Sequence, residues 1–490
     1  IGFKKTANNR WLVLRAGADS HADYQDGRNN RLLNSRFESY NFKAGFGKNA
    51  LNHSSANRAT VSFSRFGFVF DSITSIPRDA RWSRSFKGPH HQVFLANLSS
   101  EQIYFRPGGT RIQVNAGLST NLRQEDEGGG GISLSMLLNT ASLSAQVSKH
   151  LFSNTDWIYG VASSAQTNKN YGGRIIVPDA FMGDLSLYTF LKRKQDKLLI
   201  EGGARIDQKW LSTFTTGQLN VPVAAAPGAD ILPFSRSMQA ANISLGTVID
   251  LFSGFAFKAN ISSGFRPGNL AELSSNGLHE GTFRWEIGMP AARIEQNLNA
   301  EAGLLFNQKN VKASASFYRN AFRNYIYLSP TGGEYFGFLI YNYAQTNALI
   351  RGGEFQIDWV PASSGFEINS ASSFIKATKS DGMFLPFIPA ARTALEFKYH
   401  LPKMNKSSGA VVRLGGAYVF KQSNPAQFEK ETPSYFLLNG GTSFNFRKME
   451  VSLTGNNLLN RLYFDHLSRL RYYGFYNMGR NLVLSLLLKF

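Results

Sequence analysis

The sequence predicts an all-β fold, a large antiparallel transmembrane β-barrel, and three observations lead to this prediction. Apolar and polar residues alternate along the whole 490-residue chain, which is the period of a β-strand. No run of about 18 apolar residues occurs, so membrane-spanning helices are not expected, whereas a membrane-spanning strand needs only about 9–11 residues. The chain ends on a strand in which Leu484, Leu486 and Leu488 alternate with other residues before Phe490, and such an apolar edge needs a neighbouring strand and lipid to cover it.

Alternation by itself fits a soluble β-sandwich as well as a membrane barrel. In a sandwich the apolar faces meet in a core, whereas in a membrane barrel they face lipid and the polar faces line a wet lumen. The number of strands separates the two folds. Roughly 20 strand-like segments, connected by alternating short turns and longer loops, exceed what one sandwich needs. A single barrel of that size has a lumen wide enough to require a plug or to form a channel.

The alternating segments are distributed over the chain. Clear examples are residues 111–118, 140–148, 255–262, 354–359, 392–400 and 449–454. Aromatic residues make up 13% of the chain and there are 45 glycines, a composition that favours strands and tight turns. No shift in composition marks a boundary, so residues 1–490 are expected to form one domain.

Five longer connectors interrupt the alternation and are expected to be loops that carry function above a rigid wall. They are residues 71–103, 212–236, 266–296, 327–347 and 460–478.

The chain is strongly basic, with a formal net charge of +20, and it contains no cysteine. The absence of cysteine rules out disulfides, thiolate metal sites and a cysteine nucleophile. Because the basic residues are scattered and no nucleic-acid-binding motif occurs, we do not expect nucleic acid as a partner. The positive charge is expected instead to meet the phosphates of lipopolysaccharide or anionic lipid headgroups at the rim of the barrel.

Catalytic motifs are not found. The sequence has no GxSxG elbow, no HExxH helix and no phosphate-binding glycine loop followed by a helix, so neither an enzyme nor a bound cofactor is expected.

Two stretches, residues 263–304 and 454–490, resemble the TonB-dependent outer-membrane receptors. The first has the pattern of Phe265, Arg266, Pro267, Asn269, Glu272 and Leu273, followed by Glu286, Gly288, Pro290, Glu295, Asn299 and Glu301. The second has the closing pattern of Asn457, Leu458, Leu459, Asn460, Tyr463, Gly479, Arg480, Asn481 and Phe490. The likeness is nearest to receptors that take up zinc and chelated metals.

The resemblance implies an integral barrel in the outer membrane of a Gram-negative bacterium, of which about 20 of roughly 22 strands lie in this chain. It also implies an N-terminal plug and a segment that TonB grips, and neither is found here, so the plug and the first strands are expected to be missing from the given sequence. The implied function is energised import of a scarce ligand, such as a metal ion or a metal chelate like a siderophore. The alternatives are a structural subunit of an outer-membrane protein complex and a passive channel.

Candidate ligand contacts come from two loops. His279 and Glu280 lie in the surface loop of the resembling motif, where an imidazole and a carboxylate could bind a metal or contact a chelate. A plain turn with a solvated His279 is the alternative. His90 and His91 are the second candidate pair. Adjacent residues on a strand point to opposite faces, so only an irregular loop could use both histidines.

Charged and aromatic residues near the loops each allow two interpretations. The three arginines Arg266, Arg284 and Arg293 could bind an anionic substrate, or they could belong to the lumen wall, paired with Glu272, Glu286 and Glu295. Aromatic clusters are expected to mark girdles at the membrane interface, with stacking against an organic ligand as the alternative. These clusters are Tyr341 and Tyr343, Tyr435 and Phe436, and Tyr472 to Tyr476. The alternating leucines and Phe490 are expected to form the strand that closes the barrel.

Overall fold

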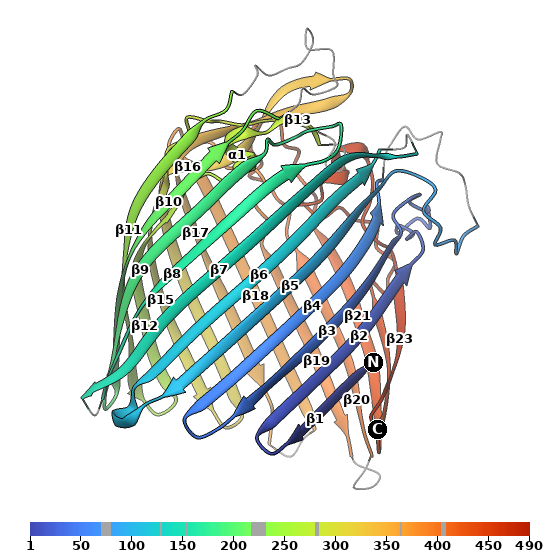
Figure 1. The fold of residues 1–490 in the computed structure, drawn as a ribbon. Helices are drawn as coiled ribbons and strands as arrows, with labels where there is room; N and C mark the ends of the chain where they lie inside the picture. Colours follow the sequence, from blue (N-terminus) through green and yellow to red (C-terminus); the bar gives the residue numbers. More distant parts are fainter. Residues whose placement is uncertain are drawn as a thin grey trace.

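The wall of the molecule is one antiparallel sheet rolled into a barrel (Figure 1). This computed structural model describes residues 1–69, 80–127, 130–152, 154–216, 232–279, 284–362, 365–402 and 408–490. Twenty-one of the 23 strands in the described residues, all except β13 and β14, form the wall. The all-β barrel predicted from the alternation is therefore confirmed, with a strand number close to the expected one.

The strands follow one another around the wall, each paired with its neighbours in the chain. The first part consists of β1 (Gly2–Ala7), β2 (Arg10–His21), β3 (Phe37–Asn49), β4 (His53–Gly67), β5 (His90–Phe105), β6 (Arg111–Asp126), β7 (Ile132–Phe152), β8 (Thr155–Asn170), β9 (Ala180–Gln195), β10 (Leu198–Thr213), β11 (Ser235–Phe252) and β12 (Phe255–Arg266). The second part consists of β15 (Glu295–Gln308), β16 (Val311–Tyr335), β17 (Phe338–Trp359), β18 (Phe366–Lys379), β19 (Arg392–Leu401), β20 (Ser408–Val419), β21 (Tyr435–Phe446), β22 (Met449–Asn456) and β23 (Asn481–Leu488).

The remaining elements are short. β13 (Asn276–His279) and β14 (Arg284–Ile287) form a small hairpin between β12 and β15, after the five-residue helix α1 (Leu270–Ser274). Two 3-10 turns, η1 (Pro107–Gly109) and η4 (Arg469–Tyr473), complete the assignment. No helix in the described part of the chain is long and apolar enough to cross a membrane.

Tight turns join the strands at the lower end of the barrel. Asn8 and Asn9 both have positive φ angles, 48° and 61°, in the turn between β1 and β2. Two left-handed residues give a turn whose twist matches that of the flanking strands, and asparagine tolerates this conformation better than most residues do. Such turns keep neighbouring strands in strict register, so that each strand shows one face to lipid and one to the lumen.

The outward face of the wall is apolar and exposed. Leu98 of β5, Leu118 of β6 and Leu143 of β7 are between 56% and 58% exposed, although each is a large hydrophobic residue. They alternate with lumen-facing polar residues such as Gln113 and Asn115 of β6, which are linked to each other at 3.3 Å. This is the arrangement of a membrane barrel and not of a soluble fold, in which large leucines would be buried.

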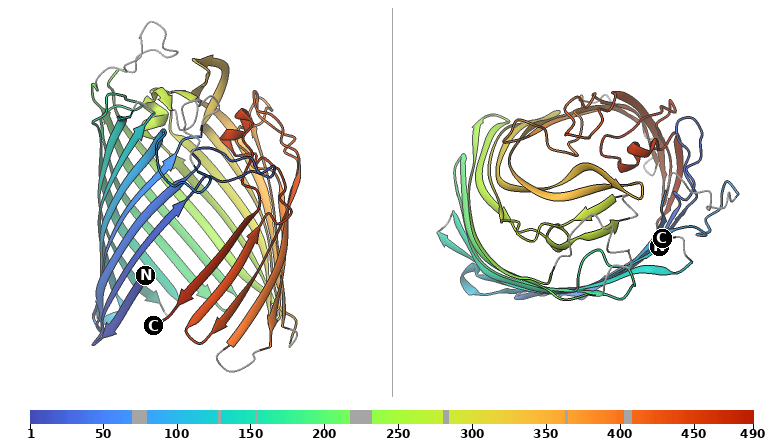
Figure 2. Two further views of the ribbon diagram at one scale, coloured as in Figure 1. Left: turned by 90° about the vertical axis from the view of Figure 1, so that its right-hand side faces the viewer. Right: turned by 90° about the horizontal axis from the view of Figure 1, so that it is seen from above.

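The upper end is where the chain packs a compact core. Seen from above, the segment with α1 and the upper part of the β16–β17 hairpin lie inside the ring of strands (Figure 2). The sequence predicted residues 327–347 to be a loop, which is wrong. They extend β16 and β17 above the wall, with a turn at Phe336 and Gly337, because cross-strand pairs such as Tyr327 with Ala344 continue the ladder.

The two ends of the sheet, β1 and β23, lie near each other, and the loops above them are joined (Figure 2). Tyr24 Oη donates to the carbonyl of Tyr476 at 3.1 Å, and Asn460 Nδ2 donates to the carbonyl of Gly27 at 3.1 Å. Asp26 and Met478 form an isolated β-bridge. The predicted terminal strand is confirmed as β23, with Leu484 75% and Leu486 61% exposed. In the described residues its only ladder is with β22, so its barrel-closing role remains a prediction.

Candidate functional site

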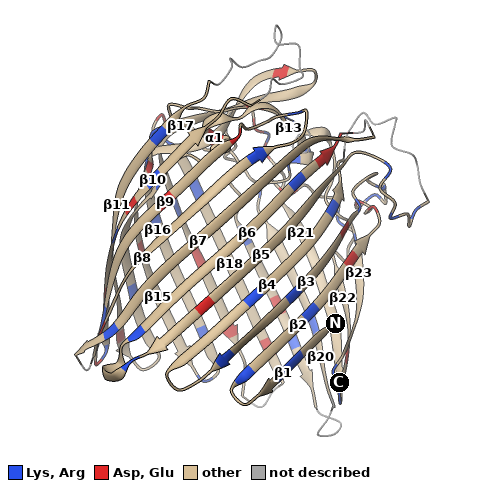
Figure 3. Cartoon of the chain, viewed as in Figure 1, with Lys and Arg blue, Asp and Glu red and all other residues tan. Residues whose placement is uncertain are grey.

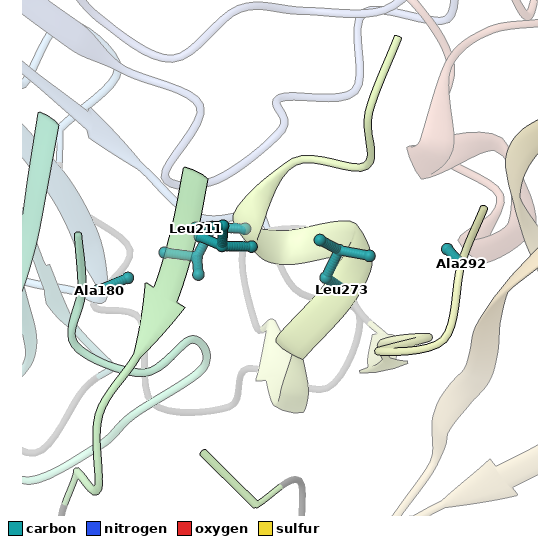
Figure 4. Close-up of a cluster of buried hydrophobic side chains, with 5 residues drawn as sticks. Ala180, Leu211, Leu273 and Ala292 are labelled. Atoms are coloured by element: carbon teal, nitrogen blue, oxygen red, sulfur yellow. The ribbon is translucent and has the colours of Figure 1, made fainter. Parts of the chain in front are cut away.

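The connector between β12 and β15 folds inward over the lumen and is anchored by a buried apolar cluster. Asn269 caps α1, since its side chain accepts a hydrogen bond from the Glu272 backbone while the Glu272 side chain accepts from the Asn269 backbone. This capping holds a helix too short to be stable alone. Leu273, with no exposed surface, and Leu270 belong to one buried cluster with Leu211 of β10, and Figure 4 shows Leu211 and Leu273 in it. The remaining members of the cluster are Ala180 of β9 and Ala292.

Arg266, at the end of β12, joins the two ends of this connector. Its Nη1 lies 2.7 Å from both carboxylate oxygens of Glu272, and its Nη2 lies 2.9 Å from Oε2 of Glu295. The same Glu295 oxygen accepts from the backbone N–H of Ile326 at 2.7 Å, which ties the inward hairpin to the connector. The structure thus places Arg266 in the paired arrangement that the sequence offered as the alternative to substrate binding.

A cavity of about 300 Å³ lies against this arginine, lined by residues that include Asp184, Lys209 and Arg266. The side chain of Arg266 is still 41% exposed, so it can contact an anion there while it holds its two carboxylates. Its role as a ligand contact remains a prediction.

The second part of the site is the strand β14, which pairs in parallel with β17 of the inward hairpin. Arg284 Nε lies 2.5 Å from Oε1 of Glu286, and the Tyr343 hydroxyl donates to Oε2 of the same carboxylate at 3.1 Å. The guanidinium of Arg284 also lies over the ring of Tyr341, 5.5 Å from its centroid. Arg284 and Glu286 are therefore paired as the sequence suggested. For Arg293 the described residues show no ion pair with a carboxylate, and its backbone N–H donates to the side chain of Gln345 at 2.7 Å.

Trp285 has no exposed surface and packs edge-on against Tyr335, with ring centroids 4.9 Å apart. Four buried polar atoms in this region have no hydrogen-bond partner in the described chain. They are Arg284 Nη1, Trp285 Nε1, Tyr335 Oη and Ser275 Oγ. A buried donor without a partner costs about 1–3 kcal/mol. The mouth of the barrel therefore contains buried polar groups that the described residues leave without a partner.

The prediction that aromatic clusters form interfacial girdles is wrong for two of the residues. Tyr341 is 5% and Tyr435 7% exposed, whereas a residue facing lipid would be accessible in the isolated chain. Phe436, 41% exposed, does lie on the outer face, next to the buried Tyr435. In the last connector, Tyr476 stacks on Phe464 with centroids 4.0 Å apart. The tyrosines point inward because the upper hairpin and loops fold over the mouth, which gives them a core to fill.

The loop placement of His90 and His91 is also wrong, because β5 begins at His90, and the connector that was expected to reach residue 103 therefore ends before these histidines. His90 Nδ1 lies 3.1 Å from the carbonyl oxygen of Gly88. The ring of His91 packs edge-on against Phe66 at 4.6 Å and lies near Phe68. Both histidines continue the ladder with β4, so they point to opposite faces and cannot act as a pair.

The other histidine candidate is only partly covered. His279 ends β13, but its side chain and the whole of Glu280 lie outside the described residues, so both remain predictions. Within the described residues, no group of three His, Cys, Asp or Glu side chains could hold a metal ion.

A buried polar cluster in the last two connectors was not predicted. His466 Nδ1 accepts from Arg471 Nη1 at 2.7 Å and lies 3.0 Å from Thr432 Oγ1, while Glu429 lies 3.3 Å from Arg471. Burial and the nearby Arg471 lower the pKa of His466 to about 4, so its ring is neutral at pH 7. No sequence signal pointed to it, because its members come from segments more than 30 residues apart in the chain.

A wide antiparallel barrel with an apolar outer face and inward-folded segments defines a membrane barrel whose lumen is partly covered at one end. The chain belongs to the family described as TonB dependent receptor-like, beta-barrel, whose model matches residues 3–458. No curated protein matches the chain closely enough in sequence to count as a relative.

Solved structures of the same fold include two metal transporters and one uptake receptor. The copper transporter OprC superposes with a TM-score of 0.81 at 14% identity, covering 99% of this chain and 77% of its own. The FrpB iron transporter from Neisseria meningitidis (F3-3 variant) gives 0.75 at 13%, covering 100% and 78%. The ferric yersiniabactin uptake receptor FyuA from Yersinia pestis gives 0.69 at 13%, covering 100% and 77%. At these identities the likeness establishes the fold.

Proposed function

We propose that this chain is the barrel of a bacterial outer-membrane receptor that imports a metal in the form of an organic chelate, driven by TonB. Membership of the receptor family supports the transport role, and the copper, iron and ferric yersiniabactin proteins of the same fold support a metal cargo. The proposal includes a plug domain inside the lumen, through which TonB opens the path.

The observation that carries the proposal is the covered mouth. Two segments, the described parts of residues 266–279 and 284–295 and the upper part of the β16–β17 hairpin, fold over the lumen and are tied together through Glu295 (Figure 2). A passive pore would need this space for diffusion, whereas a receptor needs a surface on which a ligand can be held before release.

The chemistry of the mouth favours a chelate over a bare ion. Lys209 and the exposed part of Arg266 supply positive charge beside a cavity of about 300 Å³. Tyr335 and Tyr343, each partly exposed, supply aromatic surface at the same end of the barrel. Cations and aromatic rings suit an anionic organic molecule, whereas a bare metal ion would need a set of imidazole or carboxylate ligands.

The test is uptake by cells that lack their own receptors. The complete gene is expressed in such a strain, and accumulation of iron or copper is measured with a panel of chelates, with and without functional TonB. We expect TonB-dependent accumulation of at least one chelated metal. Substitution Lys209→Gln should lower uptake several-fold by raising the concentration needed for half-saturation, while Lys48→Gln at the lower end of the barrel should leave uptake unchanged.

Other outcomes would replace the proposal. Large steady currents in a planar bilayer, with uptake independent of TonB, would establish a passive channel. Stable co-purification with other outer-membrane proteins, together with no uptake of any chelate, would establish a structural subunit.

A further inference from the structure

A row of three cations crosses the outer face of the barrel on adjacent strands. Arg319 of β16 stands directly opposite Arg351 of β17, which stands directly opposite Lys376 of β18. All three residues are exposed. Neighbouring strands are about 4.8 Å apart, so the row spans about 10 Å. Arg323, also exposed, follows Arg319 on the same face of β16, above the row.

The row lies on the lipid-facing side, as the side chains next to it show. Phe317, Phe355 and Phe374 share its face by strand alternation and are 51%, 40% and 44% exposed. The ring of Phe355 lies 5.4 Å from that of Phe317 and 6.5 Å from that of Phe374, so the three rings form a continuous apolar surface. This surface lies directly below the cations, toward the lower turns.

Gly353 makes this surface possible. It pairs with Phe317 of β16 on one side and with Phe374 of β18 on the other, two residues below Arg351 on β17. A Cβ atom there would come within 2.7 Å of Phe374 Cε1 and 3.0 Å of Phe317 Cδ1. Without a side chain at this position, the two rings can lean over the strand and leave a shallow apolar bed under the basic row.

The height of the row places it near the upper edge of the apolar band. Arg319 follows the start of β16 at Val311 by eight residues. At about 3.3 Å per residue and a tilt of about 40°, it lies about 20 Å above the lower turn. The apolar band of such a barrel is about 25 Å tall. Trp359, 44% exposed at the lower end of β17, marks the opposite edge of the band.

The cations of the row have no acidic partner among the described residues. Other outward-facing cations near the upper end do, since Arg65 lies 3.6 Å from Glu38 and Lys169 lies 3.0 Å from Asp179. Figure 3 shows that Lys and Arg are spread over the wall and not gathered into one block. Like charges directly opposite each other in a sheet repel, so an external anion with more than one charge would stabilise three in a row.

We propose that this row, together with the phenylalanine bed below it, is a binding site for a phosphorylated glycolipid of the outer leaflet, of the lipopolysaccharide type. Arg319, Arg351 and Lys376 hold the phosphates of the sugar headgroup. The two arginines do so through charge-assisted, bidentate hydrogen bonds. The acyl chains lie on Phe317, Phe355 and Phe374. A headgroup with two phosphates matches a row of about 10 Å better than a single phosphodiester does. The site is independent of the cargo that the lumen carries.

The experiment measures the lipid bound to the purified full chain by native mass spectrometry after delipidation and addition of defined lipids. The probes are bis-phosphorylated lipid A, dephosphorylated lipid A and phosphatidylglycerol. The wild-type chain should bind bis-phosphorylated lipid A at least tenfold more tightly than either of the other two. The triple variant Arg319→Gln, Arg351→Gln and Lys376→Gln should lose that preference.

The matched control carries the same change on the same outward face at the opposite end of the wall, in Arg10→Gln, Lys48→Gln and Lys149→Gln, and should bind like wild type. If the triple variant does not form a heat-modifiable barrel, the single variant Arg351→Gln, at the centre of the row, replaces it. Gly353→Ala should weaken lipid A binding without affecting phosphate selectivity. Equal binding by the triple variant and wild type would overturn the proposal, as would equal affinity for phosphatidylglycerol or retention of an acidic protein in place of lipid.

Discussion

Acidification should loosen the contact between the last two upper connectors through protonation of His466. The ring is 4% exposed, and its Nδ1 accepts a hydrogen bond from Arg471 while Nε2 lies 4.0 Å from Glu429. Protonation at Nδ1 would set two donors against each other and place a second buried cation beside Arg471. Burial and this arginine are the causes that lower the pKa of His466 to about 4, and the nearby Asp465 opposes them only in part.

The magnitude follows from the difference between the folded and the unfolded pKa. The unfolded connector has the ordinary histidine pKa of 6.5 and the folded one a pKa of about 4. Between these values the unfolded segment binds a proton that the folded segment does not, so stability is full above pH 6.5 and falls as the pH drops toward 4. The complete loss is about 3 kcal/mol, and about 2 kcal/mol of it is reached at pH 5.

Hydrogen exchange of the backbone amides in residues 457–480 measures this effect directly. After correction for the intrinsic pH dependence of exchange, protection at pH 5 should be about 30-fold lower than at pH 8. His466→Gln should abolish the pH dependence, whereas His400→Gln, at an exposed lower-end position, should leave it intact. Protection that is constant across this range in the wild-type chain would refute the reasoning.

Three further changes test other parts of the structure. Arg266→Met leaves two carboxylates without their cation, so the connector between β12 and β15 should lose about 3–5 kcal/mol of stability. The connector should then become sensitive to limited proteolysis, and an unchanged cleavage pattern would contradict this. Leu484→Lys places a charge on the lipid face and should lower the free energy of unfolding by about 2–4 kcal/mol, measured by reversible urea unfolding from lipid vesicles. Leu487→Lys, on the lumen face, should lower it much less. Equal losses would argue against the assigned faces. Asn457→Ala removes side-chain hydrogen bonds to the backbone N–H and carbonyl of Arg461, at 2.7 and 2.9 Å. It should lower the stability of the upper loops by about 2 kcal/mol, measured as a lower temperature of thermal unfolding, whereas an unchanged temperature would show that water replaces both bonds.

Most of the fold could be predicted from the local alternation of apolar and polar residues. Period-two patterns at residues such as 140–148 and 449–454 identified strands and their apolar faces, because side-chain direction in a strand depends only on position parity. The resembling motif also contained the partners of one cluster, since Arg266, Glu272 and Glu295 lie within 30 residues of one another and flank a single connector.

The sequence by itself therefore determined the class of fold, the lipid-facing residues and the position of the main mouth connector. Only the tertiary structure decided that Tyr341 and Tyr435 face inward, that His90 and His91 lie on a strand, and that Arg319, Arg351 and Lys376 stand side by side. The reason is that strand length and cross-strand register depend on pairing with a neighbouring segment. A residue's own surroundings in the chain say which face it occupies, but not which residues of other strands stand beside it.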